Sequence, residues 1–107
     1  HAFPHNPMPG LYDASLFNAS LAIGKNLADQ LGIRSPTTYS QRDETGITRA
    51  IVPLLAAAKI GMISLGAGGG SGGHPEIPDL FLWKDNATNT SVIFLFDHGY
   101  GGGLHVL

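Results

Sequence analysis

The apolar residues between positions 14 and 31 recur at helical spacing, with Leu16, Leu21, Ile23, Leu27 and Leu31 falling near one face. Asp13 precedes this stretch as a plausible N-cap, and Gly32 follows it as a plausible C′ residue. The pattern therefore predicts an amphipathic helix of about five turns, at 3.6 residues per turn, with that apolar face turned to the core. Gly24 in the middle of this helix indicates either a close contact with the sheet or simple tolerance.

Beyond this helix, short β-favouring segments alternate with a second helical stretch. Residues 37–41 are rich in Thr and Tyr, residues 48–58 have helical character, and residues 62–65 form a short apolar segment. Pro53 lies within the helical stretch, so that helix either bends at Pro53 or begins there. Strand, helix and strand joined by tight connections are typical of a parallel sheet.

The last part of the pattern predicts a β-hairpin. Apolar residues 80–83 and 91–96 flank the turn-forming stretch 84–90, and the second run is apolar enough to be buried on both faces. The whole chain, residues 1–107, is thus predicted to be one partial α/β domain, with about two βα units followed by a hairpin. We expect unpaired strand edges at 37–41 or 91–96, which would favour association.

Composition narrows the class of protein. The net charge is −2 without a basic run, and no apolar stretch has membrane-spanning length, so neither nucleic acid nor a membrane is indicated as a partner. Cysteine is absent, which excludes thiolate metal sites and cysteine nucleophiles. Three glycosylation sequons, at Asn18, Asn86 and Asn89, favour a secreted glycoprotein over chance.

The candidate reactive centre is the segment that follows the predicted strand at 37–41. Arg42, Asp43 and Glu44 stand where this strand gives way to a glycine and then to the next helix. Ligand sites of α/β proteins gather at such carboxyl ends of strands. We place the reactive group at Asp43. Arg42 is expected to favour the charged form of Asp43 and to contact the substrate. The alternative is that Asp43 is only an N-terminal helix cap.

Other side chains are candidates for contacts with a substrate, each with a packing or turn role as the alternative. His5 can line a site from a proline-rich loop, and His98 ends a buried strand. Trp83 and Tyr100 are able to stack on a sugar ring. The glycine-rich residues 66–73 match nucleotide-binding and nucleophile-elbow patterns, but Pro75 and Pro78 stand where both motifs need a helix.

The order of the elements carries a resemblance to a known family. A proline-rich opening, a helix ending in Leu31-Gly32, a strand, the turn Asp43-x-x-Gly46, the helix with Pro53-Leu54-Leu55, a short strand and the hairpin after Phe81-Leu82-Trp83 together resemble the catalytic domain of the glycoside hydrolase family 38 α-mannosidases. The similarity is closer to an uncharacterised fungal and bacterial branch of that superfamily, in which the opening His1-Ala2-Phe3-Pro4-x-Asn6 and the turn Gln41-Arg42-Asp43-x-x-Gly46 recur. It spans nearly the whole chain as a pattern of elements with few fixed residues.

The resemblance implies a (β/α) barrel that binds zinc at its strand ends, with Asp43 as both nucleophile and metal ligand. The other zinc ligands and the acid/base carboxylate that the family pattern requires fall outside this chain. We therefore expect a fragment of a secreted, metal-dependent retaining glycoside hydrolase, inactive in isolation, with a carbohydrate substrate and the remainder of the barrel as partners. The alternatives are a deacetylase-like barrel, in which Asp43 is a metal ligand or base, and a non-catalytic carbohydrate-binding remnant.

Overall fold

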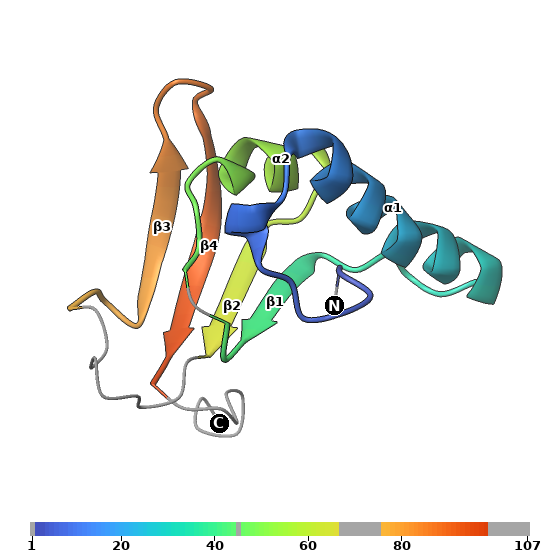
Figure 1. Cartoon of the computed structure of the whole chain (residues 1–107), viewed down its shortest axis with the longest axis horizontal. Helices are drawn as coiled ribbons and strands as arrows, with labels where there is room; N and C mark the ends of the chain where they lie inside the picture. The colour runs from blue at the N-terminus through green and yellow to red at the C-terminus, as the bar shows by residue number, and fades with distance from the viewer. Residues whose placement is uncertain (1, 45, 67–75, 99–107) are drawn as a thin grey trace.

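The computed structural model describes residues 2–44, 46–66 and 76–98 and contains a helical layer on a four-stranded sheet (Figure 1). A short 3-10 turn, η1 (Pro9–Leu11), precedes the long helix α1 (Ala14–Leu31). The remaining elements follow in the order β1 (Thr38–Arg42), α2 (Ile51–Ala57), β2 (Met62–Gly66), β3 (Leu80–Asp85) and β4 (Thr90–Asp97). In the described parts of the chain, no helix has the length and apolar character needed to cross a membrane.

The sheet has the strand order β1-β2-β4-β3. Strands β1, β2 and β4 are parallel, and β3 pairs antiparallel with β4 at one edge. The mixed α/β architecture and the hairpin predicted from the sequence are therefore confirmed. The prediction of a free edge at 91–96 is wrong, because β4 lies between β2 and β3 and is paired on both sides.

Both ends of α1 are capped as the sequence predicts. The Asp13 side chain accepts a hydrogen bond of 2.7 Å from the Leu16 amide, and Gly32 takes a left-handed conformation with φ 64°. These are local signals: a short acceptor at the N-cap and a residue without Cβ at the C-terminal end. Local chemistry alone is therefore sufficient to place this helix.

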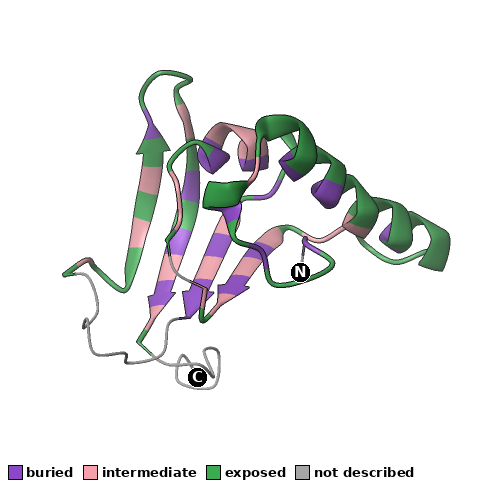
Figure 2. Ribbon diagram, in the orientation of Figure 1, coloured by how far each residue is buried: buried purple, intermediate pink, exposed green. Residues whose placement is uncertain are grey.

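The buried face of α1 differs from the predicted one (Figure 2). Among its apolar residues, Phe17, Leu21 and Ala28 are buried, and Ser20 lies with them. The four residues Leu16, Ile23, Leu27 and Leu31 are each at least half exposed. The helix carries two apolar stripes, and the one with Phe17 is buried because this ring packs 5.0 Å from Phe3 and 6.0 Å from Tyr39, centroid to centroid.

Gly24 is the site of a close approach, but to the N-terminal segment rather than to a strand. A Cβ at this position would lie 2.5 Å from the carbonyl oxygen of Ala2. The Ala2 amide in turn donates a 2.8 Å hydrogen bond to the carbonyl oxygen of Thr38 on β1. The segment around Ala2 therefore lies between α1 and the edge of the sheet, and the missing side chain at Gly24 makes room for it.

We expect Gly24→Ala to destabilise the protein by about 2 kcal/mol, although helix propensity alone predicts a gain of about 1 kcal/mol. The added methyl group would meet backbone, which cannot swing aside. Urea unfolding monitored by circular dichroism measures the effect. Asn26→Ala, at an exposed position of the same helix, is the control and should gain a few tenths of a kcal/mol. A comparable gain for Gly24→Ala would show that the close approach is absent.

Pro53 is accommodated without a kink, because α2 begins at Ile51 and Pro53 is its third residue. The first amides of a helix have no partner within the helix, so a proline in the first turn costs no hydrogen bond. Thr48 precedes the helix, and its hydroxyl accepts a 3.3 Å hydrogen bond from the Ala50 amide. Ile51, Val52 and Leu55 are the buried residues of α2.

The core lies between the two helices and one face of the sheet. This inner face carries the alternate buried residues of the strands, which are Tyr39, Gln41, Ile63, Leu65, Val92, Phe94 and Phe96. The opposite face is open, with Leu80, Leu82 and Ile93 about half exposed or more. The prediction that the second hairpin strand is buried on both faces is therefore wrong. Its even-numbered residues Val92 to Phe96 are covered by helices, but Ile93 on the other face is not.

The outer edge of β1 is covered near both of its ends. The Ala2 amide donates a hydrogen bond to the Thr38 carbonyl, as described above. At the other end, Nδ2 of Asn6 donates to the Arg42 carbonyl, and Oδ1 of Asn6 accepts from the Arg42 amide. The carboxamide of Asn6 has the same donor and acceptor as a peptide group, so it acts as one residue of a neighbouring strand. The expectation of a strand edge at 37–41 is therefore confirmed, because β1 is an edge strand of the sheet, and the N-terminal segment covers this edge at Thr38 and Arg42.

The turn of the hairpin is organised by Asp85, which is buried. Its Oδ2 accepts hydrogen bonds from the hydroxyl and the amide of Thr88, at 2.6 and 3.1 Å, and Oδ1 lies 3.6 Å from Nε of Arg49. The Thr88 hydroxyl is the main cause that holds the pKa of the Asp85 carboxyl below its usual value, with smaller contributions from the Thr88 amide and Arg49. Stabilisation from the ionised carboxylate is therefore complete above the unfolded-state pKa of about 3.9 and disappears as the pH falls through the lower folded value.

We expect Thr88→Val to be less stable than the wild type at pH 7, with a difference that shrinks on acidification below about pH 4. The valine removes the hydroxyl that favours the ionised carboxylate, so the advantage of the wild type persists only while Asp85 is charged. Urea unfolding of both proteins between pH 7 and pH 2.5 measures the difference. A difference that stays constant over this range would mean that Thr88 acts through packing alone.

Candidate functional site

The carboxyl ends of the three parallel strands lie at one edge of the sheet, and Asp43 follows the first of them (Figure 1). Asp43 has a left-handed backbone conformation with φ 55°, which aspartate tolerates better than most residues. Its amide donates a 2.7 Å hydrogen bond to the carbonyl oxygen of Gly66 at the end of β2. The residue itself is exposed. The main chain of Asp43 is thus tied to the sheet at an exposed position.

A buried glutamine fixes the backbone that follows Asp43. Gln41 is fully buried on the inner face of β1, and its Nε2 donates to the carbonyl oxygens of Glu44 at 3.2 Å and Gly46 at 2.9 Å. The hydroxyl of Tyr39 donates a 3.1 Å bond to Oε1 of the same side chain. Burial, and secondarily the nearby Tyr12, raises the pKa of the Tyr39 phenol far above its usual range, so this donor stays protonated. The backbone that follows Asp43 is therefore held in place by the buried side chain of Gln41.

The guanidinium of Arg42 forms hydrogen bonds with groups of the sheet. Its Nη1 donates to the carbonyl oxygens of Gln41 at 2.9 Å and Ser64 at 2.7 Å, and its Nη2 donates to the Ser64 hydroxyl at 2.9 Å. These bonds hold the side chain along the open face, across β2. Arg42 thus braces the ends of β1 and β2 beside Asp43.

The N-terminal segment brings His5 to the same end of the sheet. The neighbouring Asn6 forms hydrogen bonds with the Arg42 backbone. His5 Nε2 lies 2.7 Å from the Tyr12 hydroxyl. The His5 ring also stands edge-on to Phe3, with 5.7 Å between the ring centroids. Asn6 carried no signal as a site residue in the sequence beyond its place in the opening motif, because its partner is 36 positions away.

The end of β4 adds two more titratable groups. Gly66 is in register with Arg42 on one side and Asp97 on the other, so the Cα atoms of Arg42 and Asp97 are roughly 10 Å apart at normal strand spacing. His98 follows, with Nε2 2.9 Å from Oδ1 of Asp79 and its ring 4.8 Å from Phe96. The end of the sheet at which the parallel strands have their carboxyl ends therefore carries His5, Arg42, Asp43, Asp97 and His98.

Trp83 lies far from this edge. It pairs with Val92 in the hairpin register, five residues before Asp97, which corresponds to about 17 Å along the strand. Its ring packs edge-on against Phe94 with a centroid distance of 5.3 Å. Trp83 is thus not brought together with Asp43. Tyr100, the other predicted stacking residue, lies outside the described residues.

The helix-cap alternative for Asp43 is wrong. Helix α2 begins at Ile51, eight positions after Asp43, with Ala50 at its N-cap position. Glu44, the adjacent carboxylate, also stands well before this helix and is half-buried. Neither carboxylate therefore caps α2.

Within the part of the chain that the structure describes, no three His, Cys, Asp or Glu side chains are grouped so that they could hold a metal ion. Catalytic zinc takes three protein ligands and a water or substrate. The described residues offer the Asp43 carboxylate as one donor, so they do not make a zinc site by themselves.

Comparison of the chain with protein-family models, with curated proteins and with solved structures finds no match. Function must therefore be argued from the arrangement of the residues.

Proposed function

We propose that this chain is part of a secreted, metal-dependent retaining glycoside hydrolase of the α-mannosidase type, and that Asp43 is its nucleophile. The observation that carries the proposal is the setting of Asp43. An exposed aspartate stands at the carboxyl ends of parallel strands, on a backbone tied down by Gly66, and the segment after it is tied down by Gln41. A nucleophile needs both features, because its attacking oxygen must be accessible and its position must be fixed.

The distribution of helices supports a barrel. In a doubly wound sheet helices cover both faces, whereas in a (β/α) barrel all helices lie outside and the opposite face lines the interior. Here the buried residues of α1 and α2 join one core on the same face of the sheet. The other face carries apolar residues that would suit a barrel interior, among them Leu82 and Ile93.

In a retaining mechanism, one Oδ atom of Asp43 attacks the anomeric carbon as the bond from that carbon to the leaving oxygen breaks. A second carboxyl group, about 5–5.5 Å away, protonates the leaving oxygen and later activates water to hydrolyse the glycosyl ester. We assign this acid/base to the part of the parent protein outside this chain. His5 and His98, at the same edge of the sheet, are proposed to contact hydroxyl groups of the sugar.

Zinc, when bound, would supply Lewis-acid stabilisation of charge in this family's chemistry. The single carboxylate offered here does not complete a zinc site, so each step above is assigned to side chains alone. Arg42 is bonded to Ser64, and we propose that it positions the end of β1 rather than binding the sugar.

The three sequons support the secretory assignment. Asn18 is exposed on α1, and Asn86 and Asn89 are exposed in the turn between β3 and β4. All three side-chain amides are therefore accessible to a glycan, as a secreted glycoprotein requires.

The proposal is tested by trapping the covalent intermediate in the longer parent protein. A 2-deoxy-2-fluoro glycosyl fluoride slows hydrolysis of the glycosyl ester, and peptide mass spectrometry then locates the modified residue. We expect the label on Asp43, and no labelling or aryl-glycoside hydrolysis by the 107-residue chain, which lacks the matched acid. A label on another carboxylate would refute the role of Asp43. Hydrolysis with inversion, or deacetylation without glycosidase activity, would refute the assigned reaction.

A further inference from the structure

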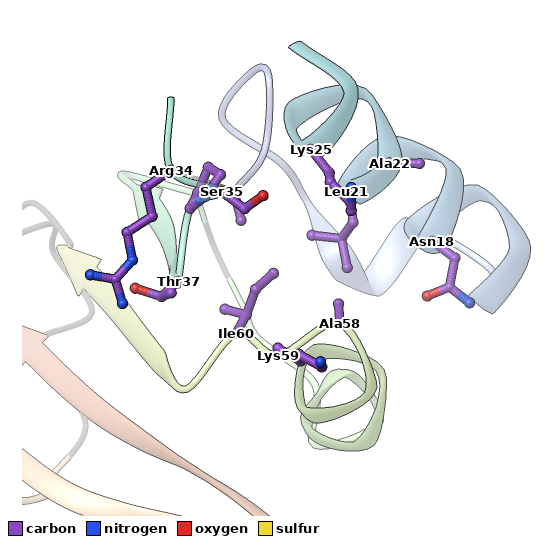
Figure 3. Close-up of a pocket in the computed structure, with 12 residues that line it drawn as sticks. Asn18, Leu21, Ala22, Lys25, Arg34, Ser35, Thr37, Ala58, Lys59 and Ile60 are labelled. Atoms are coloured by element: carbon purple, nitrogen blue, oxygen red, sulfur yellow. The ribbon is translucent and has the colours of Figure 1, made fainter. Parts of the chain in front are cut away.

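A groove of about 460 Å³ lies between α1, the connection that precedes β1 and the end of α2 (Figure 3). It opens next to Thr37 and Ile60, which lead into β1 and β2, and so lies at the opposite end of the strands from Asp43. Its volume falls within the range of small-molecule sites. This location makes the groove independent of the proposed catalytic centre.

The floor of the groove is apolar. Leu21 of α1 and Ile60 after α2 are both buried and point toward each other across it (Figure 3). Ala2, Ala22, Pro36 and Ala58 complete the apolar lining. An aliphatic or similarly apolar group would be needed to fill this space.

The rim of the groove is cationic although the chain as a whole is acidic. Three of the six Lys and Arg residues line the groove, namely Lys25, Arg34 and Lys59, and none of the eight Asp and Glu residues is among the described residues that line it. Lys25 is paired with Asp29 on the same helix. Among the residues that the structure describes, Arg34 and Lys59 form no ion pair, so their charge is available to a ligand.

Lys59 also occupies a position that would favour a glycine. It has a left-handed backbone with φ 60°, its amide bonds the carbonyl of Ala56 at 3.0 Å, and the Ile60 amide bonds Leu55 at 2.9 Å. This is the hydrogen-bond pattern of a Schellman C-terminus, in which glycine usually takes the left-handed residue. A lysine there is strained, and strained residues of this kind concentrate at ligand sites.

We propose that this groove binds a small anionic amphiphile, with an aliphatic body on Leu21 and Ile60 and a carboxylate head held by Lys59, to which Arg34 adds positive charge at the rim. The apolar floor accounts for the body, and the unpaired cations account for the charge of the head. The hydroxyl groups on the rim, from Ser35 and Thr37, can donate further hydrogen bonds to the head.

The 107-residue chain is titrated with decanoate by calorimetry and by ¹H–¹⁵N NMR, with decanol as the uncharged probe of the same length. We expect saturable binding of decanoate with a Kd on the order of 0.1 mM, and decanol to bind about tenfold more weakly because it lacks the ion pairs. Amide shifts should concentrate at Ala22, Ala58 and Ile60.

Two charge variants and one matched control make the test specific. Lys59→Gly and Arg34→Gln should each weaken decanoate binding by about threefold and leave decanol binding unchanged. Lys59→Gly should at the same time raise the Tm by a few degrees, because it relieves the left-handed lysine, so weaker binding cannot be attributed to unfolding. Lys84→Gln, on a strand away from the groove, should change neither binding nor specificity.

Equal affinity for decanoate and decanol, or loss of decanoate affinity in Lys84→Gln as large as in Lys59→Gly, would overturn the proposal. So would shifts concentrated at Leu80 and Leu82, which would show association with the open face of the sheet. Shifts at Ala22 and Ala58 that depend on protein concentration without ligand would mean that a second copy of the chain occupies the groove. None of these outcomes bears on Asp43, so this proposal and the proposed hydrolase function fail independently.

Discussion

Replacing Asp43 with Asn in the proposed glycoside hydrolase is expected to lower kcat/KM for an aryl glycoside by about 10⁴-fold or more. Asn keeps the size of the side chain and, like Asp, tolerates the left-handed conformation at φ 55°. The hydrogen bond from the Asp43 amide to the carbonyl oxygen of Gly66 involves only the backbone and is retained. Only the attacking charge is removed, so urea unfolding should show little change in stability while the covalent step is lost.

Glu44→Gln is the matched control for this substitution, because it removes one charge from the adjacent carboxylate. The structure involves Glu44 through its backbone carbonyl, which accepts from Gln41 and is unchanged by the substitution. We expect less than a tenfold loss of activity. Small and equal losses for both variants would show that Asp43 is not the nucleophile. Restoration of the Asp43→Asn variant by azide, with formation of a glycosyl azide, would add direct support for a missing nucleophile.

The elements could be predicted from the sequence because their signals are local. Asp13 and Gly32 bracket α1 through contacts within a few residues, and the hairpin follows from two apolar runs around a turn. Which of the two apolar stripes of α1 is buried could not be predicted from local signals. The burial depends on the contacts of the Phe17 ring with Phe3 and Tyr39, and the sequence of the helix does not indicate where those two rings lie.

The candidate site was predictable in its centre but not in its surroundings. The position of Asp43 after a strand follows from the order of elements alone. That Trp83 lies at the other end of the sheet depends on the pairing of β4 with β2, which joins segments about 30 residues apart in the chain. The Asn6 contact with Arg42 is equally non-local. Sequence reasoning therefore identified side chains with suitable chemistry without being able to say which of them meet.

Gln41 is the clearest case of a residue whose role requires the structure. The alternation of β1 places it on the same face as Tyr39, and that face is buried. A polar residue at such a position must find partners, since an unsatisfied buried amide costs about 1–3 kcal/mol. The pattern thus implies partners for Gln41, but it does not reveal that they are the carbonyl groups of Glu44 and Gly46 behind Asp43.

Replacing Gln41 with Leu is expected to destabilise the 107-residue chain by about 3 kcal/mol. Leucine fills much of the same space, so little cavity is created. However, the carbonyl groups of Glu44 and Gly46 lose their donor, and the Tyr39 hydroxyl loses its acceptor within the core. The loss is measured by urea unfolding at pH 7. Ser40→Ala, one position away on the open face, serves as the control and should cost less than about 0.5 kcal/mol.

Because Gln41 holds the segment after Asp43, its loss should also be visible locally. Hydrogen exchange at the Asp43 amide, which is bonded to Gly66, should accelerate in Gln41→Leu under conditions in which the amides of α1 remain protected. In the proposed hydrolase the same variant should lower kcat with Asp43 intact, since a loosened backbone would hold the proposed nucleophile less often in its reactive position. Uniform acceleration across the sheet and α1 would instead mean that Gln41 supports the fold as a whole. Unchanged exchange and a cost equal to that of Ser40→Ala would show that the hydrogen bonds of Gln41 contribute nothing to holding this turn.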